Sequence, residues 1–438
     1  MKFSRLSHTV LRAGLLVAAI SPVAHATTYT VDRGHALAND ENPGTPTQPL
    51  RTISRAAALA RAGDTVVVMS GMYPESVQVT NSGTPTQPIS FTAKGKVVVS
   101  PTSQDNWTGV FNVLGKSDIS ISGFTVQNAY YGLKVAADRA GTPPTRITLK
   151  NNYASMTRSS GINVNSGRDI TVDSNVVEKT NYGGVHEMIS IINTDGFLVK
   201  NNEVFNGKFV VNGVTKEGKE GIDIKEGSRN GRVLNNKVHD LARLGIYVDA
   251  WDLLTHTIEV SGNVVYNCKN GIAIASEQGG LVKDVLVSNN IAYNNMFNGI
   301  IVASWSLDGP RENIQIINNT VYGNAQGGIR IGTTNIFKLD IQNNISANNG
   351  GPAFSAVNAG LVSSSINNLS FGKNPGNILS GMLTGDPRFV GASSGNFQLS
   401  AGSAAANKGV AARRVPIDIV GRARPLGGAF DIGAFESN

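Results

Sequence analysis

A repeat of short strands runs through the middle of the chain and constrains its fold more than any other feature. Each unit reads apolar-x-apolar-x-Asn-Asn-x-apolar, then a polar gap and Gly-Ile-x-Ile, as in ITLKNNY, ITVDSNVV and IQIINNTV. The apolar residues alternate with period two, which predicts strands. Successive units are 23, 27, 34, 27, 27, 29 and 25 residues apart, counted between Asn152, Asn175, Asn202, Asn236, Asn263, Asn290, Asn319 and Asn344.

A period of this length built from short strands is typical of a solenoid. Leucine-rich repeats need a Leu-x-x-Leu-x-Leu frame, which the sequence lacks, and propeller blades need longer repeats with hairpin turns. The pattern therefore predicts a parallel β-helix with one repeat per coil and strands about 4.8 Å apart. We expect the Asn residues at equivalent corners to form a ladder of side-chain amides.

The rest of the composition fits one repetitive domain. Charged residues make up 16% of the 438 positions, too few for a coiled coil, and the 40% hydrophobic content argues against disorder. The single Cys excludes an internal disulfide. We predict one β-helix domain over residues 27–438, with an N-terminal cap and first coils at 27–107, regular coils at 108–350 and an irregular closing cap at 351–438. Residues 52–62 (TISRAAALARA) are expected to form a capping helix.

The first 26 residues have the three parts of a secretory signal peptide. Lys2, Arg5 and Arg12 make a basic start, residues 13–20 are apolar, and AHA at 24–26 is a small-x-small cleavage site. We expect export to a bacterial periplasm or beyond, no membrane anchor, and a monomer. Cleavage would remove these three basic residues and lower the formal net charge from +7 to +4, a mildly basic value that fits an acidic partner. Interleaved acidic residues argue against nucleic-acid binding.

The repeats and the segment NPGTPTQPLRTISRAAALARAGDTVVVMSGMYPE resemble the right-handed parallel β-helix, pectate-lyase-like superfamily of exported polysaccharide-active proteins. A second, local resemblance concerns EGIDIK, which is similar to a strand of the chondroitinase B and alginate lyase family that ends in a catalytic lysine. It implies Lys225 as that lysine and Glu220 as a Ca²⁺ ligand. The family's second acidic ligand falls on Gly218 and its catalytic arginine on Asp249, so Arg243 is the candidate to replace the arginine.

The x positions of Gly-Ile-x-Ile-x point outward, and stacked coils place them in columns on one face. Ionisable groups and aromatics on a long face suit an extended glycan. The 34-residue step inserts KFVVNGVTKEGKEG, a loop expected to bring Lys208, Lys216 and Lys219 near this face. The predicted strip contains Lys134, Asn163, Asn165, His186, Glu187, Asp223, Lys225, Glu226, Tyr247, Asp249, Trp251, Asp252, Ser276, Glu277, Gln278, Trp305 and Arg330.

The favoured reaction is β-elimination on an acidic, uronate-containing polysaccharide. It needs a neutralised uronate carboxylate, a base for the C5 proton and a proton for the leaving oxygen. We predict Lys225 as a base with a lowered pKa. Further catalytic candidates are Arg243, His186 and Tyr247. If Ca²⁺ is the cofactor, its candidate ligands are Glu220, Asp223, Asp249 and Asp252. Substrate-binding candidates are Lys134, Asn163, Asn165, Trp251, Glu277, Trp305 and Arg330.

Two other functions remain open from the sequence. Hydrolysis needs carboxylates on both sides of the glycosidic bond, and acids on neighbouring coils would lie roughly 5 to 10 Å apart. The candidates for that reaction are Asp223, Asp249, Asp252 and Glu277. A non-catalytic glycan-binding or surface protein would use the same strip for recognition alone.

Overall fold

The computed structural model describes residues 1, 26–183 and 185–437. The signal peptide predicted at 1–26 falls almost entirely on residues outside this range and stays a prediction. Within the described residues, no helix is both long and apolar enough to cross a membrane.

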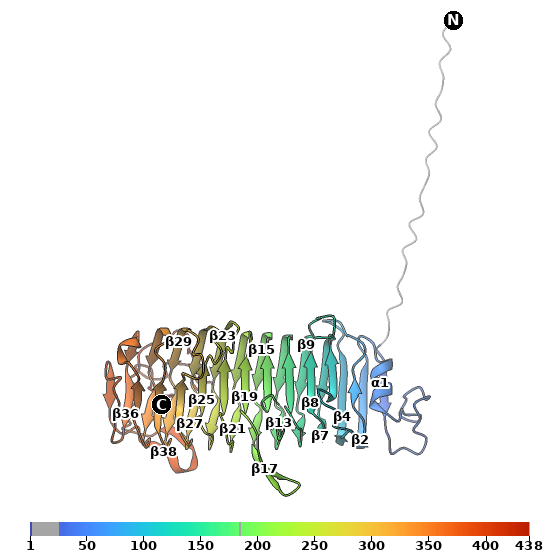
Figure 1. Ribbon diagram of the computed structural model, residues 1–438, viewed down its shortest axis with the longest axis horizontal. Helices are drawn as coiled ribbons and strands as arrows, with labels where there is room; N and C mark the ends of the chain where they lie inside the picture. Colours follow the sequence, from blue (N-terminus) through green and yellow to red (C-terminus); the bar gives the residue numbers. More distant parts are fainter. Residues whose placement is uncertain (2–25, 184, 438) are drawn as a thin grey trace.

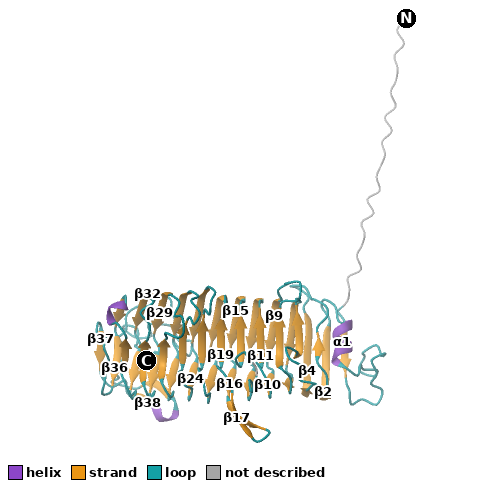
Figure 2. Ribbon diagram, in the orientation of Figure 1, coloured by secondary structure: helices purple, strands orange, loops and turns teal. Residues whose placement is uncertain are grey.

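The chain winds into a stack of coils with three parallel strands in each regular coil, as the repeat predicts (Figures 1 and 2). One coil, for example, consists of β12 (Arg168–Asp173), β13 (Val176–Glu178) and β14 (Ile189–Ile192). Each strand pairs in parallel with its counterparts in the coils before and after it. The predicted right-handed parallel β-helix is therefore confirmed.

One face of the stack is an 11-stranded sheet, to which each regular coil contributes one strand. Its strands are β3 (Val77–Gln78), β5 (Gly109–Leu114), β8 (Tyr131–Ala136), β11 (Ile162–Asn165), β14, β19 (Ile222–Lys225), β22 (Ile246–Asp249), β25 (Ile272–Ala275), β28 (Asn298–Val302), β31 (Gly327–Ile331) and β34 (Phe354–Ala356).

The other two faces are linked into a 24-stranded sheet. Besides β12 and β13 it contains β1 (Thr28–Val31), β2 (Thr65–Tyr73), β4 (Ile89–Val99), β6 (Ser117–Ser122), β7 (Thr125–Gln127), β9 (Thr145–Lys150), β10 (Tyr153–Ser155), β15 (Asp195–Lys200), β16 (Glu203–Phe205), β20 (Arg229–Leu234), β21 (Lys237–His239), β23 (Thr255–Ser261), β24 (Val264–Tyr266), β26 (Val282–Ser288), β27 (Ile291–Tyr293), β29 (Arg311–Ile317), β30 (Thr320–Tyr322), β32 (Ile336–Gln342), β33 (Ile345–Ala347), β35 (Ser364–Ile366), β36 (Asn368–Phe371) and β37 (Met382–Thr384).

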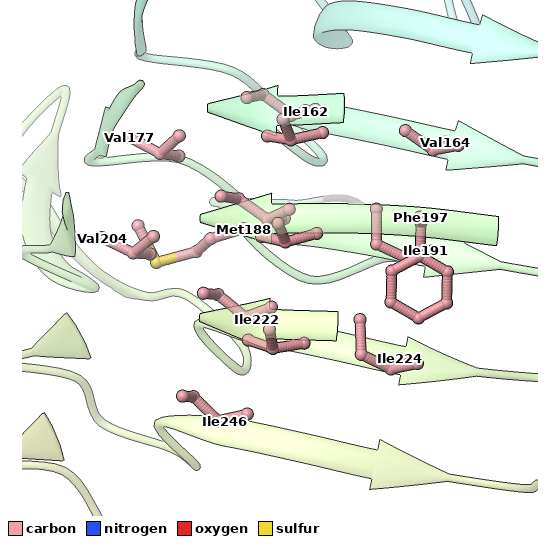
Figure 3. Close-up of a cluster of buried hydrophobic side chains, with 14 of the residues drawn as sticks. Ile162, Val164, Val177, Met188, Ile191, Phe197, Val204, Ile222, Ile224 and Ile246 are labelled. Atoms are coloured by element: carbon pink, nitrogen blue, oxygen red, sulfur yellow. The ribbon is translucent and has the colours of Figure 1, made fainter. Parts of the chain in front are cut away.

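Alternate side chains of every strand fill the interior of the coil stack. Ile162, Ile222 and Ile246 come from three different coils, and each is fully buried. Figure 3 shows them one above another, beside the second inward column that Val164 and Ile224 form. Burial of aliphatic side chains contributes about 25 cal/mol per Å² of apolar surface. The core thus continues from coil to coil.

The predicted asparagine ladder is present and lies inside the stack. The side-chain amide of Asn263 accepts from the backbone N–H and Nδ2 of Asn236, both at 2.9 Å, and donates to Oδ1 of Asn290 at 2.9 Å. Equivalent Nδ2–Oδ1 bonds of 2.9 to 3.1 Å continue to both sides and extend the ladder to Asn368. The ladder satisfies the buried backbone at each corner.

The glycine that opens Gly-Ile-x-Ile is required by close approach between coils. A Cβ at Gly221 would lie 2.6 Å from the carbonyl oxygen of Gly245 in the next coil, and one at Gly245 would lie 2.7 Å from that of Gly271. No side chain fits at those distances. The repeated glycine therefore keeps the strands of the 11-stranded sheet in register.

Helix α1 (Ile53–Leu59) lies at the N-terminal end of the stack (Figure 1) and is shorter than the predicted 52–62. The Thr52 side chain caps it by accepting the N–H of Arg55 at 3.1 Å. It ends before residue 60 because the Asp64 carboxylate accepts the N–H of Arg61 at 2.8 Å and holds a turn there.

The segment after β37 folds back along the side of the stack. It contains the hairpin β38 (Phe389–Gly391) and β39 (Asn396–Leu399), with the short 3₁₀ helix η2 (Ala392–Ser394) between the two strands. Another 3₁₀ helix, η1 (Ala359–Leu361), lies earlier in the chain, between β34 and β35. Arg424 donates to Oδ1 of Asn289 at 3.0 Å, and Asn318 donates to the carbonyl oxygen of Asp431 at 3.0 Å. The segment thus covers earlier coils, and its predicted role as an end cap is not confirmed.

Candidate active site

The outward positions of the 11-stranded sheet form the column that the sequence predicts. Strand pairing aligns Lys134 with Asn163, then continues through Ser190 to Asp223 and Tyr247. Further along, the column continues through Ala273 and Ile301 to Arg330. A parallel column carries Asn165 and Lys225, with Asp249 on the next coil.

Several residues expected on strands stand in loops beside the sheet instead. His186 and Glu187 precede β14, whose outward residue is Ser190, because the strand begins at Ile189, after the GVHEM sequence used to predict it. Glu277 and Trp305 also lie outside the strands, in the loops that follow β25 and β28. These loops form the wall of the groove above the sheet.

An acidic centre formed by Glu187, Asp223, Asp249 and Glu277 occupies four neighbouring coils around Lys225. The Lys225 Nζ lies 3.0 Å from Oε1 of Glu187 and 3.9 Å from Oδ2 of Asp223. Glu187 also accepts a hydrogen bond from the Ser190 hydroxyl at 2.9 Å. The Lys225 side chain is only 11% exposed, so the lysine is held among carboxylates.

This environment contradicts the predicted lowered pKa of Lys225. Burial alone would lower the pKa, but the carboxylates of Asp223 and Glu187 outweigh it and raise the pKa above the ordinary lysine value. Lys225 is therefore a persistent cation. A neutral lysine base at this position does not fit the structure.

Two carboxyl groups of the acidic centre resist ionisation. Burial, followed by the nearby carboxylate of Glu187, raises the pKa of Asp223 well above its usual range. Burial also raises the pKa of Asp249 to about 7, with Glu277 the largest charged contributor and the N–H of Trp251 acting in the opposite direction. A carboxyl group that holds its proton near neutral pH can serve as an acid.

Tyr247 links the acidic centre to the next coils. Its hydroxyl donates to Oε1 of Glu277 at 2.7 Å, and its ring meets that of Trp305 edge-on with centroids 5.6 Å apart. Burial and the carboxylates of Asp249 and Glu277 raise the pKa of Tyr247 well above the ordinary tyrosine value. The phenol is therefore a neutral donor that orients Glu277.

Two of the predicted calcium ligands, Glu220 and Asp223, lie beside cationic side chains. Glu220 accepts from Nε of Arg243 at 3.0 Å, and Lys225 lies between Glu187 and Asp223. Across residues 26–183 and 185–437, no set of three or more His, Cys, Asp or Glu side chains is arranged to hold a metal ion. These groups do not fit a calcium site, and the calcium expectation stays a prediction without support here.

Two adjoining pockets make up the groove. The acidic pocket, of about 310 Å³, is lined by six carboxyl groups and three cationic side chains and includes the acidic centre, Glu220, Trp251 and His186. The cationic pocket, of about 610 Å³, is lined by three cationic side chains and two carboxyl groups. Glu220, Arg243 and Glu277 line both pockets, so the pockets are continuous along the stack.

Aromatic side chains stand at the N-terminal end of the groove. The ring of His186 stacks on Tyr131 with centroids 6.1 Å apart, and Trp107, which is 54% exposed, lies over Tyr130 at 5.4 Å. Burial lowers the pKa of His186. The Lys134 Nζ donates to the carbonyl oxygen of Trp107 at 2.6 Å, so this lysine supports the cluster.

The other predicted residues are less closely tied to the groove. Asp252 is exposed and lines neither pocket. Among the described residues, Nδ2 of the buried Asn163 has no hydrogen-bond partner, and Oδ1 of Asn165 accepts from the Ser166 hydroxyl. The insertion forms a hairpin, β17 (Lys208–Val211) and β18 (Val214–Glu217), that projects from the stack (Figure 1). Of its three lysines, only Lys219 lines the acidic pocket.

Sequence reasoning gave no role to three residues that the structure brings into the groove. Glu187 was expected on the strip, but its ion pair with Lys225 spans 38 residues and leaves no local signal. Lys269 and Phe297 precede β25 and β28, and the Lys269 Nζ lies 5.4 Å from the centroid of the Phe297 ring. Their shared position before the Gly-Ile motif was the one available signal.

The fold and the groove together define a parallel β-helix protein with an acidic centre on one sheet. A family model described as the right handed beta helix region matches residues 108–308. The uncharacterized protein YwoF of Bacillus subtilis (strain 168) is 30% identical over 379 residues, which cover 76% of this chain and 79% of YwoF. The chain belongs to the right-handed β-helix family.

Solved structures show the same architecture at low sequence identity. The pectate lyase Pel9A is 14% identical, with a TM-score of 0.57 over 95% of this chain and 98% of that chain. XylC in complex with xylose is 12% identical, with a TM-score of 0.59 over 94% of this chain and 99% of that one. At these identities the similarity concerns the fold.

Proposed function

We propose that this protein is a carbohydrate-active enzyme that hydrolyses glycosidic bonds in a polymeric glycan bound along the 11-stranded sheet. The observation that carries the proposal is the carboxyl group of Asp249, whose pKa is raised to about 7 beside Glu277. Hydrolysis requires such an acid together with a second, ionised carboxylate.

In this mechanism Asp249 donates its proton to the glycosidic oxygen as the bond from that oxygen to the sugar carbon breaks. Glu277, which accepts the Tyr247 hydroxyl, takes a proton from the attacking water. The two residues line the same pocket from neighbouring coils. A base that activates water directly corresponds to the inverting mechanism. The ion pair of Lys225 with Glu187 limits the net charge around Asp249.

The test is release of reducing ends from a panel of glycan polymers, neutral and acidic. Asp249→Asn and Glu277→Gln should each lower kcat by about 100-fold or more, because general acid–base catalysis contributes about 10² to 10⁴. Asp252→Asn is the matched control, since Asp252 is exposed and outside the groove. Full activity of Asp249→Asn, or binding without turnover on every polymer, would contradict the proposal.

β-Elimination on an acidic polysaccharide is the second candidate. The cationic side chains of Lys219, Lys225 and Arg243 line the acidic pocket and favour it, since a uronate carboxylate must be neutralised. With its raised pKa, Lys225 stays charged and would help to neutralise that carboxylate. The two reactions differ in products, because only elimination creates a C4–C5 double bond that absorbs in the near ultraviolet.

Export and a monomeric state form part of the same proposal. A polymeric glycan meets the enzyme outside the cytoplasm, which agrees with the predicted signal peptide at 1–26. N-terminal sequencing of the secreted or periplasmic protein should begin after Ala26, and light scattering should give the mass of one chain.

A further inference from the structure

We propose that the cationic pocket binds an anionic group of the glycan, a carboxylate or a sulfate, at a distance from the bond that is cleaved. The inference rests on the proposed function and specifies its substrate as a mixed polymer. The sugar at the acidic centre is neutral, and a charged sugar lies towards the C-terminal end of the stack.

Charge is segregated along the groove. Of the two groove pockets, Lys269 and Arg330 line only the cationic one, and within the described ranges neither forms an ion pair with a carboxylate. Arg330 is exposed, and the Lys269 ammonium faces the Phe297 ring. Two cations in one pocket, neither of them paired with a described carboxylate, provide a receptor for an external anion.

The floor of this pocket is apolar. Ile301 on β28 and Ala303 just after it line the pocket together with Leu244. Trp305, half-buried and packed against Tyr247, forms one wall. A sugar ring can therefore lie on Ile301 and beside Trp305, with its charged substituent directed at the cations.

The acidic pocket is less suited to the same anion. Two of its cations, Lys225 and Arg243, are already paired with Glu187 and Glu220. Arg330 lies three strands beyond Tyr247 in the outward column. Three strand spacings correspond to roughly 14 Å, or about two to three sugar units.

The experiment measures equilibrium binding of the full-length Asp249→Asn protein to two pairs of polymers. One pair is a xylan with glucuronate side groups and its carboxyl-reduced form. The other is a sulfated galactan and its desulfated form. Binding is compared among this protein and versions that also carry Arg330→Gln, Lys269→Gln or, as the control, Lys96→Gln, which removes an exposed lysine on another face.

We expect the charged member of at least one pair to bind about tenfold more tightly than its neutral form. Arg330→Gln and Lys269→Gln should each remove most of that difference, and Lys96→Gln should preserve it. The inference is overturned if charged and neutral forms bind equally, or if the preference survives both substitutions. Reducing-end release by the wild-type protein is measured in parallel, so charge-dependent binding without hydrolysis would retain this pocket and reject only the proposed reaction.

Discussion

Substituting Asp249 with Asn should stabilise the protein at alkaline pH and have little effect at acidic pH. Asp249 is 2% exposed, and its pKa of about 7 lies above the value of about 3.9 that an aspartate has in an unfolded chain. The folded state therefore binds the proton more tightly than the unfolded state. Stability is lost as the pH rises from about 4 to about 7, and the loss is complete above that interval.

The size of the effect follows from the same two values. A difference of about three pH units corresponds to about 4 kcal/mol, which is the upper limit expected at pH 8.5. At pH 4 the same calculation leaves about 0.5 kcal/mol. Asparagine has nearly the same shape but carries no charge, so Asp249→Asn should raise the free energy of unfolding by a few kcal/mol at pH 8.5 alone.

Denaturant titrations of both proteins at pH 4 and pH 8.5 measure this difference. Asp252→Asn, the same substitution at an exposed position, should leave stability unchanged at both pH values. An equal effect of Asp249→Asn at the two pH values would refute the reasoning, because a simple packing change does not depend on pH. So would a loss of stability that grows with pH.

Four further outcomes follow from the structure. Asn263→Ala should lower the free energy of unfolding by about 3 to 5 kcal/mol in denaturant titration, because four buried hydrogen bonds of the ladder lose a partner. Arg311→Met should increase amide hydrogen exchange in residues 303–309, since its fully buried guanidinium group holds carbonyl oxygens and a carboxylate of that loop. For hydrolysis, kcat/KM should fall as the pH rises above about 7, where Asp249 loses its proton. Glu187→Gln should move that alkaline limb to lower pH, because the Glu187 carboxylate helps to raise the pKa of Asp249.

The repeat made the architecture predictable because coil stacking leaves little freedom. Once strands recur with period two, register between coils aligns Asp223 with Tyr247 and turns the asparagines into a ladder. The same reasoning aligned Lys134 with Asn163 on the outward column. These features depend on backbone periodicity, which the sequence displays directly.

The protonation states of the site could not be predicted in this way. The expectation for Lys225 assumed that desolvation or cationic neighbours would lower its pKa, whereas the Glu187 carboxylate reaches it from a loop in the preceding coil at 3.0 Å. Loop residues such as Glu277 have no fixed register, so their distance from Asp249 depends on tertiary structure. The protonation states at the site depend on contacts between side chains of different coils. The sequence of a single repeat contains only one of the two partners in each contact.

The groove crosses the strands, so its length is counted in coils. Deleting or duplicating one complete repeat between β25 and β31 would change the span from the acidic centre to Arg330 in a step of about 4.8 Å, close to one sugar unit. The asparagine ladder and the core would close over the junction, because every coil presents the same surfaces to its neighbours. Among relatives, the preferred spacing between a charged sugar and the cleaved bond could therefore change by one coil at a time. The chemistry of the acidic centre would stay unchanged.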